Sequence, residues 1–325
     1  MFIIINNDNQ EKPEKAGSGM DLKQMQYFLC LAQEGNVTRA AGQLNIVQPA
    51  LSMQIAKLEK SLGKQLFYRA SRGMSLTPAG EALLQRIAPI ISDIDRVRDE
   101  IGQLDGKISG RVSIGMIASV AQSTLPTSSA TIAAKYPEIH LLVCEGYSET
   151  LLEWVTAGQL DIAIVNTPAL RLTPAARPIL DEEMLLAHGA GNKLALPKAI
   201  SFDRLEGLDL VIPSRRHGLR RILDDAASEA GFSLRPRLEI DTLSAICEVV
   251  ATTDLLTVLP GIVLHSTLSE GRIRARRLRN PAITRSVAWV TNPRRSVSAA
   301  MSAVMDIIAD DLTRAATSAS RLVRN

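Results

Sequence analysis

Side chains that form good hydrogen bonds with base edges are concentrated between Gln48 and Lys57. The amides of Gln48 and Gln54 and the hydroxyl of Ser52 both donate and accept hydrogen bonds, and Lys57 adds a positive charge. Pro49 is typical of the first turn of a helix, where its missing N–H costs nothing. Small or amide-bearing side chains at the start of a helix can enter a major groove and contact bases. This stretch is therefore a candidate base-reading helix.

The elements that must position this helix can be predicted from its apolar face and from the residues before it. Asn36 is a good N-cap for a preceding helix, and residues 45–47 leave room for a tight turn between the two. Four aliphatic residues of the second helix recur at spacings of four, three and four, which predicts one face that packs on the first helix. We therefore expect a helix-turn-helix. The aliphatic residues are Leu51, Ile55, Leu58 and Leu62.

A nearly gap-free series of motifs runs from Met20 to Gly80. It consists of Ala40-Ala41, Leu44, Gln48-Pro49-Ala50-Leu51-Ser52, Gln54-Ile55, Leu58-Glu59, Leu62-Gly63, Leu66-Phe67, Arg69 and Leu76-Thr77-Pro78-Ala79-Gly80. Together these motifs resemble the N-terminal domain of LysR-type transcriptional regulators. Two positions depart from the family pattern. Val47 stands where Ser or Thr usually precedes the Gln-Pro pair, and Met53 stands where many members have Arg; both bear on base preference and leave the expected fold unchanged.

Residues 63–76 predict two short strands around the turn Ser71-Arg72-Gly73, which would form a wing. In the resembling family such a hairpin lies along the DNA backbone or the minor groove, where arginine is favoured. Arg69 could instead pair with an acid of its own fold. Seven basic residues against three acidic ones between Met20 and Gly80 suit a phosphate-facing surface. The predicted DNA contacts are Val37, Thr38, Arg39, Gln48, Pro49, Ala50, Ser52, Met53, Gln54, Lys57, Arg69 and Arg72.

Thr77 and Pro78 begin a longer helix, as its N-cap and its first residue. Pro89 should kink or restart this helix. Aliphatic residues along it follow a three-four rhythm that is typical of a coiled-coil seam, so we expect it to pair with the same helix of another subunit in a homodimer or homotetramer. The alternative is that it packs on the C-terminal part of its own chain. The seam comprises Leu84, Ile87, Ile91, Ile94, Val97 or Arg98, Ile101 and Leu104.

Beyond a hinge at residues 104–110, strands and helices alternate with short connections, which predicts parallel strands covered by helices. The pattern continues after Thr167 into a second lobe, and the chain returns to the first lobe at Ser286–Thr291. Two lobes crossed twice resemble the effector-binding domain of the same family, which is similar to periplasmic solute-binding proteins. The expected fold class is α/β, with an N-terminal winged helix-turn-helix and a two-lobed, doubly wound effector domain. The expected domains are a disordered extension (1–19), the winged helix-turn-helix (20–77), a dimerising linker helix (78–106) and the effector domain (107–325).

Ligands of such sheets bind outside the carboxyl ends of the strands, which places a candidate cleft between the lobes. Residues 116–121 end one strand and lead into a helix, so the Ser119 hydroxyl and the adjacent N–H groups predict an anion pocket. Its counterpart on the second lobe is the basic loop 213–218. Ser119 could instead be a plain N-cap, and the arginines of the loop could serve only at the surface. The predicted contacts with a small effector, an organic acid, are Ser119, Val120, Ser214, Arg215 and His217.

Motifs for other chemistry are missing from the sequence. It has no nucleophile elbow, no phosphate-binding glycine loop and no paired His/Cys spacing, so we expect no catalysis, no metal and no cofactor. Cys30, Cys144 and Cys247 stand among apolar neighbours, which favours buried free thiols and a reducing, cytoplasmic location. We therefore predict a sequence-specific regulator that binds double-stranded DNA and responds to an anionic metabolite. The alternative is a two-lobed small-molecule-binding protein or enzyme without DNA binding.

Overall fold

The computed structural model describes residues 20–70, 73–102, 107–166, 176–194, 196–292 and 296–324. The extension predicted for residues 1–19 and the Leu104 end of the linker seam lie outside these ranges. The chain divides into two compact units after Ile94.

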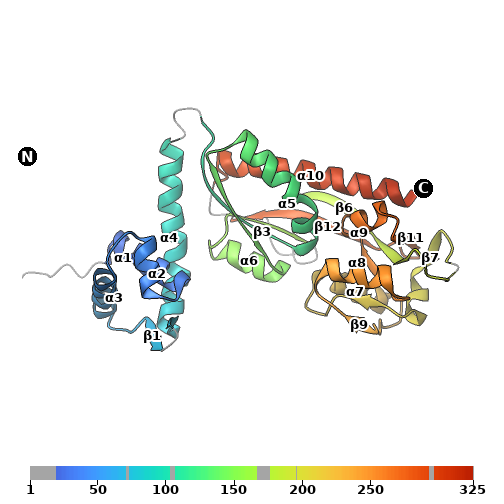
Figure 1. The fold of residues 1–325 in the computed structure, drawn as a ribbon, viewed down its shortest axis with the longest axis horizontal. Helices are drawn as coiled ribbons and strands as arrows, with labels where there is room; N and C mark the ends of the chain where they lie inside the picture. The colour runs from blue at the N-terminus through green and yellow to red at the C-terminus, as the bar shows by residue number, and fades with distance from the viewer. Residues whose placement is uncertain are drawn as a thin grey trace, which may run out of the picture. The chain divides into compact units, whose positions relative to one another are not determined.

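The N-terminal unit consists of three helices, a two-stranded antiparallel hairpin and the start of a long helix (Figure 1). The side chain of Asn36 accepts hydrogen bonds from the backbone N–H groups of Thr38 and Arg39, and Thr77 Oγ1 accepts one from Gly80 N at 3.0 Å. These caps confirm the predicted starts of the second and fourth helices. The elements are α1 (Leu22–Glu34), α2 (Val37–Gln43), α3 (Gln48–Leu62), β1 (Phe67–Ala70), β2 (Gly73–Leu76) and α4 (Pro78–Gly102).

Buried aliphatic and aromatic side chains hold α1, α2 and α3 together. Phe28 of α1 and Leu51 and Leu58 of α3 are fully buried, which confirms the predicted apolar face of the second motif helix. Leu62 differs from the prediction because it is 40% exposed, at the point where α3 ends on Gly63 in the left-handed conformation.

Hydrogen bonds to backbone groups fix the hairpin to the helices on either side. Glu59 Oε1 accepts a bond from Leu66 N at 2.7 Å, and Thr77 Oγ1 donates one to the Gln65 carbonyl at 2.7 Å. Gly80 lets α4 approach this segment closely, since a Cβ there would lie 2.2 Å from the Leu66 carbonyl oxygen. The position of the hairpin therefore depends on Glu59, Thr77 and Gly80.

Helix α4 carries two aliphatic stripes, whereas the sequence predicted one seam. Ile87 and Ile91 are 1% and 6% exposed and belong to the core of the N-terminal unit, with Leu84 packed against it. This stripe is covered by its own domain and is not available to another subunit. A second stripe, here called the outer stripe, repeats at spacings of four, three and four. It consists of Ile90 (44% exposed), the half-buried Ile94, Val97 (54%) and Ile101 (63%).

The C-terminal unit is a two-lobed α/β domain, as expected. Lobe 1 contains β3 (Gly110–Met116), α5 (Ala118–Lys135), β4 (Ile139–Glu145), α6 (Ser148–Thr156), β5 (Ile162–Asn166), β12 (Thr284–Thr291) and α10 (Ala299–Arg324). Its strands β4, β3 and β5 are parallel neighbours. Helices α5 and α10 cover one face of these strands, and α6 covers the other (Figure 1).

The long strand β6 (Ala176–Gly189) runs from lobe 1 into lobe 2, and the chain returns to lobe 1 at residues 280–283. The first half of β6 pairs with β12, and its second half pairs with strands of lobe 2. The elements of lobe 2 are β7 (Ala199–Ser201), a 3-10 helix η3 (Phe202–Gly207), β8 (Val211–Ile212), α7 (Gly218–Glu229), β9 (Leu238–Glu239), α8 (Leu243–Thr252), β10 (Leu256–Pro260), α9 (Gly261–Ser269) and β11 (Ile273–Arg279).

Several elements differ from those expected. Helix α4 runs without a break through Pro89, which was expected to kink or restart it. Helix α9 and strand β11 were not predicted. Ile262 to Leu264 of α9 are buried on every side, which removes the helical periodicity, and the five arginines between 272 and 279 hide the alternation of β11.

Candidate functional site

The predicted base-contacting residues of α3 lie on the sides of the helix that face away from the core. Gln48, Pro49, Met53 and Lys57 are exposed, while the buried face is occupied by aliphatic residues. The remaining predicted contacts, Ala50, Ser52 and Gln54, are half-buried. The structure therefore brings all seven α3 residues of the prediction onto one accessible helix surface.

The start of α2 adjoins this surface. Thr38 and Arg39 are exposed, and Val37 is half-buried. A groove of about 290 Å³ runs between α2, α3 and β2, and its lining includes Asn36, Val37, Thr38, Gln48, Ser52 and Met74. Arg39 pairs with Glu34 at 3.1 Å, and because both groups face solvent this pair is weak enough to exchange for a phosphate.

The structure describes the backbone of only one of the two wing arginines, Arg69. Arg69 lies on β1 opposite Met74 in the antiparallel register, and the prediction for its side chain is not tested by the structure. Arg72 lies outside the described residues. Their roles as DNA contacts remain predictions.

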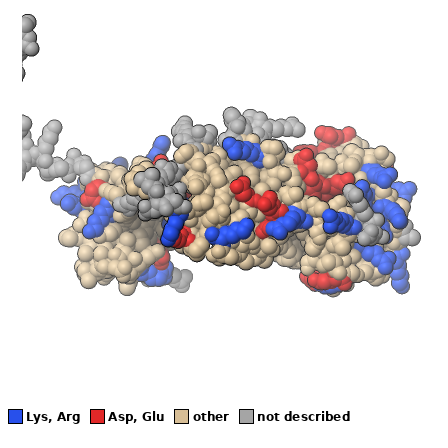
Figure 2. Space-filling model, turned by 90° about the horizontal axis from the view of Figure 1, so that it is seen from above, with Lys and Arg blue, Asp and Glu red and all other residues tan. Residues whose placement is uncertain are grey.

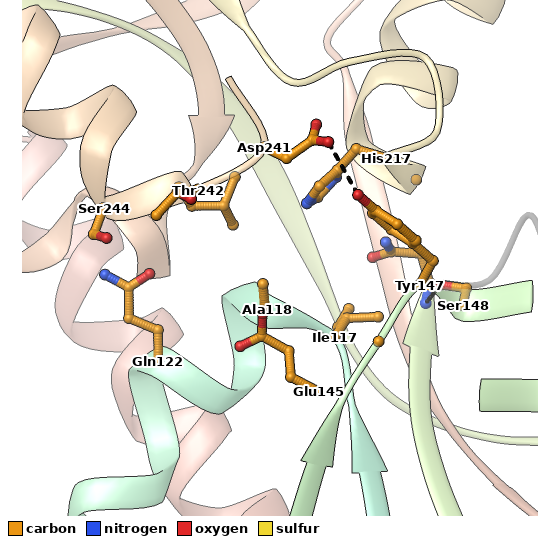
Figure 3. A pocket seen from close by; sticks show the side chains of 14 residues that line it. Ile117, Ala118, Gln122, Glu145, Tyr147, Ser148, His217, Asp241, Thr242 and Ser244 are labelled. Atoms are coloured by element: carbon orange, nitrogen blue, oxygen red, sulfur yellow. Dashed lines mark hydrogen bonds between the residues drawn. The ribbon is translucent and has the colours of Figure 1, made fainter. Parts of the chain in front are cut away.

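The second candidate site is a cavity of about 500 Å³ between the two lobes of the C-terminal unit. On the face of this unit seen in Figure 2, both basic and acidic side chains lie at the surface among uncharged ones. The cavity itself is lined mainly by polar groups. Figure 3 shows Gln122 and Ala118 of α5 facing Thr242 and Ser244 of lobe 2 across it.

Four helices begin at this cavity, two from each lobe. The first residues of α5, α6, α7 and α8 all line it: Ala118, Ser148, Gly218 and Leu243. Three of these helices have no side-chain hydrogen bond at the N-cap, and the fourth is capped by His217, whose Nδ1 accepts from Leu219 N at 3.2 Å. Helix N-termini present N–H donors and a partial positive charge, so their convergence favours a negative ligand.

Two carboxylates oppose this tendency in part. Glu145 is an exposed lining residue, and Asp241 lies beside His217. The carboxylate of Asp241 accepts hydrogen bonds from Ser214 N, Ser214 Oγ and the Tyr147 hydroxyl at 2.9, 3.1 and 3.0 Å. Partial burial raises the pKa of Asp241, but these hydrogen bonds outweigh it and hold the pKa below its usual value. Its charge is therefore largely used within the protein.

The Tyr147–Asp241 bond also connects the lobes, as Figure 3 shows. Arg221 of α7 pairs with Glu149 of α6 at 2.5 Å, which is a second link between lobe 2 and lobe 1. Burial lowers the pKa of His217 below its ordinary value, in spite of the nearby Asp241 carboxylate. The neutral imidazole is thus the form that caps α7 and lies against the Tyr147 ring.

The predicted effector contacts are only partly brought together. His217 lines the cavity, and Ser214 supports it through Asp241, but Arg215 is exposed and is not a lining residue. Ser119 and Val120 differ from the prediction, because both are buried and neither lines the cavity. The Ser119 hydroxyl accepts a hydrogen bond from Arg285 Nη1 at 2.6 Å, and Ser119 is not among the residues that line the cavity. The lining residues that the sequence analysis missed include Gln122, Glu145, Tyr147, Asn166, Asp241, Thr242 and Ser244.

Arg285 is a deeply buried charged residue of this region. It is 1% exposed and donates to Glu182 Oε2 from Nε at 3.0 Å and from Nη2 at 2.8 Å. Glu182 Oε1 in turn accepts from Ile262 N at 2.7 Å, and Asn166 Oδ1 lies 3.5 Å from Arg285 Nη1. This network ties β12, β6, α5 and α9 together directly behind the cavity. Its only sequence signal was that Arg285 is the one charged residue of β12.

The cysteines are poorly suited to oxidation by peroxide, which attacks thiolates. Burial raises the pKa of Cys30 and Cys144, and it raises the pKa of Cys247 to about 11. None of the three lines the cavity between the lobes. Among the described residues no cluster of His, Cys, Asp or Glu could hold a metal ion, and no described helix has the length and apolar character needed to cross a membrane.

The fold and these two surfaces define a winged helix-turn-helix protein with a two-lobed sensor domain. Residues 22–81 match the family profile described as "Bacterial regulatory helix-turn-helix protein, lysR family", and residues 105–313 match "LysR substrate binding domain". The chain belongs to the LysR family. It is a LysR-type DNA-binding transcriptional regulator with an effector-binding domain.

Relatives with known names span most of this chain. A "Probable hydrogen peroxide-inducible genes activator" of Streptomyces viridosporus is 30% identical over 273 residues, which is 82% of this chain and 86% of the relative. The "Nitrogen assimilation regulatory protein nac" of Klebsiella aerogenes is 26% identical over 297 residues, covering 91% and 96%.

Solved structures share the fold. A cysteine variant of full-length OxyR from Pseudomonas aeruginosa has a TM-score of 0.70 at 23% identity and covers 90% of this chain and 97% of its own. CbnR in complex with its target DNA has a TM-score of 0.65 at 18% identity, covering 91% and 100%.

Proposed function

We propose that this regulator binds a specific DNA site through α3 and the start of α2, and that a small organic acid bound between the lobes modulates that binding. The observation that carries the ligand class is the convergence of α5, α6, α7 and α8 on one cavity. A bound carboxylate would accept hydrogen bonds from N–H groups that no side chain caps. Each helix end contributes roughly 0.3–1 kcal/mol to an exposed anion and more to a partly buried one.

The size and polarity of the cavity limit the ligand further. The cavity volume of about 500 Å³ lies within the range that is usual for small-molecule binding sites. Gln122, Asn166, Thr242 and Ser244 provide amide and hydroxyl groups that can bind further polar atoms of the ligand. The acid should therefore carry hydroxyl, keto or amide groups besides its carboxylate.

The ligand would act through the contacts between the lobes. A molecule that touches α5 and α6 as well as α7 and α8 favours the closed arrangement, in which Tyr147 bonds Asp241 and Arg221 pairs with Glu149. The ligand regulates DNA binding only to the extent that its affinity differs between this closed arrangement of the lobes and a more open one.

The outer stripe of α4 supports a homodimer or homotetramer. Its four aliphatic residues keep a coiled-coil spacing while remaining wholly or partly exposed, which is unfavourable unless another subunit covers them. We place the protein in the cytoplasm, where its DNA target lies.

Peroxide sensing, which the names of some relatives suggest, is not the function that we propose here. Cys247 is buried with a pKa of about 11, so its reactive thiolate is scarce at neutral pH. The uncapped helix ends instead favour a bound anion.

Isothermal titration calorimetry of the full chain with a panel of small organic acids tests the ligand class. Ser244→Asp places a negative charge on the exposed cavity wall and should abolish binding of an acid that the parent binds, whereas the similarly sized Ser244→Asn should retain it. An acid that binds all three proteins equally would exclude this cavity as its site.

A further inference from the structure

The face of α3 that points away from the core carries an apolar strip, which consists of Pro49, Ala50, Met53 and Ala56. Met53 is 63% exposed, and only Ala50 of the four is half-buried. At 3.6 residues per turn, Met53 lies about 200° around the helix from both Leu51 and Ile55. Since Leu51 and Ile55 are 0% and 4% exposed, Met53 occupies the side opposite the core.

The surroundings of this strip are basic and polar. Lys57, Lys60 and Lys64 are exposed at and beyond its end, and Gln48 and Ser52 lie beside its start. A basic surface with this composition is complementary to a phosphate backbone. These lysines would also attract an acidic protein, but the match of residues 22–81 to the LysR helix-turn-helix profile favours DNA as the partner.

A strip of Pro, Ala and Met side chains has no hydrogen-bond donor and only a weak acceptor in the Met53 sulfur. It therefore cannot distinguish bases by the donor and acceptor pattern of their edges. The one apolar feature that the major groove presents is the C5-methyl group of thymine.

We propose that Met53 determines specificity by contacting the methyl group of a thymine in each half-site. Pro49 and Ala56, one turn before and three residues after Met53, exclude water around this contact. Gln48 and Ser52 contact adjacent base edges by hydrogen bonds. The inference rests on the DNA binding of the family and adds to it the base that this chain prefers at one position.

The test starts with duplexes selected from a random library by the full-length parent protein. Each thymine of a selected duplex is then replaced by deoxyuridine, which removes only the methyl group, and affinity is measured at fixed salt. We expect one position per half-site at which the parent loses affinity about fourfold, the equivalent of one buried CH₂-sized group.

The Met53→Ala variant should lose the same factor on the thymine duplex and should no longer distinguish thymine from uracil at that position. Its fold should be unchanged because the side chain is exposed, which circular dichroism verifies. Lys57→Ala is the matched control on the next turn. It should weaken binding to both duplexes alike and reduce the salt dependence by about one unit, as expected for a lost phosphate contact.

A Met53→Ala protein that keeps the full uracil penalty at every position would overturn the proposal. So would a variant that binds every duplex as the parent does, since the strip would then serve a protein partner or none. If the parent protein selects specific duplexes but Met53→Ala behaves in either of these ways, the thymine contact is wrong while DNA binding itself stands. If the parent selects no specific duplex, the proposed DNA binding fails.

Discussion

Two residues of the sensor domain, His217 and Arg285, shape the cavity between the lobes. Arg285 is buried with Glu182, and removing either partner alone would leave an uncompensated charge, which is strongly destabilising in a protein interior. Because Arg285 also holds Ser119 and approaches Asn166, it fixes the wall of the cavity without being part of it. His217 belongs to the cavity itself and caps α7.

The first prediction concerns pH. Burial lowers the pKa of His217 in the folded state, so the unfolded chain binds more protons. Its contribution to stability is therefore complete above the unfolded pKa of about 6.5 and is lost as pH falls toward the folded value. Protonation would also remove the acceptor that caps Leu219 N and would place a cation near Arg285. We expect the melting temperature of the parent to fall more between pH 7.5 and pH 5.5 than that of His217→Asn.

Asn is a suitable replacement because its side-chain oxygen can still cap α7 but does not titrate. His188, whose pKa is also lowered by burial, is present in both proteins and cancels in the comparison. Equal melting-temperature changes in the two proteins would show that His217 is not the titrating group.

Among the elements, α3 carries most of the predicted base contacts but has no side-chain hydrogen bond at its N-cap. Its N-cap is Val47, which is 69% exposed and makes no side-chain cap hydrogen bond. Helices α1 and α2 are capped by Asp21 and Asn36, so α3 is the poorly capped member of the motif.

The second prediction is that Val47→Ser stabilises the first turn of α3 by about 1 kcal/mol, because a serine hydroxyl can accept from an N–H group of that turn. Hydrogen-exchange mass spectrometry of the full chain should show roughly fivefold slower exchange in peptides from residues 48–62. Val47→Ala shortens the side chain without adding an acceptor and should show no such protection. Equal exchange in the Ser and Ala variants would mean that the cap does not form.

At the scale of the whole molecule, α4 separates two functions on two stripes. Ile87 and Ile91 belong to the core of the N-terminal unit, and the outer stripe is the surface that we propose for assembly. Substitutions on the two stripes should therefore have different consequences.

The third prediction is that Ile101→Glu dissociates the protein without unfolding it, because a carboxylate at an exposed position is harmless until a second subunit would bury it. Sedimentation velocity at micromolar concentration should show the parent as a dimer or tetramer and the variant with at least roughly tenfold weaker association. Ile87→Glu should instead unfold the N-terminal unit, since Ile87 is 1% exposed.

Gln85→Glu is the matched control, since it adds the same charge at an exposed position of α4 outside the outer stripe. It should leave the assembly unchanged. A monomeric parent, or an Ile101→Glu protein that assembles as the parent does, would show that the outer stripe is not the interface.

The sequence by itself determined the helix-turn-helix, the wing and the order of most strands and helices. Their signals are local: Asn36 and Thr77 cap the helices that follow them, and Leu51, Ile55 and Leu58 repeat at helical spacing. The alternation of strands and helices also predicted the parallel strands of lobe 1, because a short crossover permits few other arrangements.

Only the tertiary structure decided which residues form the sites of the sensor domain. Arg285 meets Glu182 and Ser119 across 103 and 166 residues of sequence, so no short-range pattern could assign Ser119 to Arg285 in place of a ligand. The same holds for α4, where Ile87 and Ile90 look alike in the sequence and are separated only by what packs against each. The cavity likewise exists because four helices from different parts of the chain begin at one place, and that convergence is a property of the folded sheet rather than of any single segment.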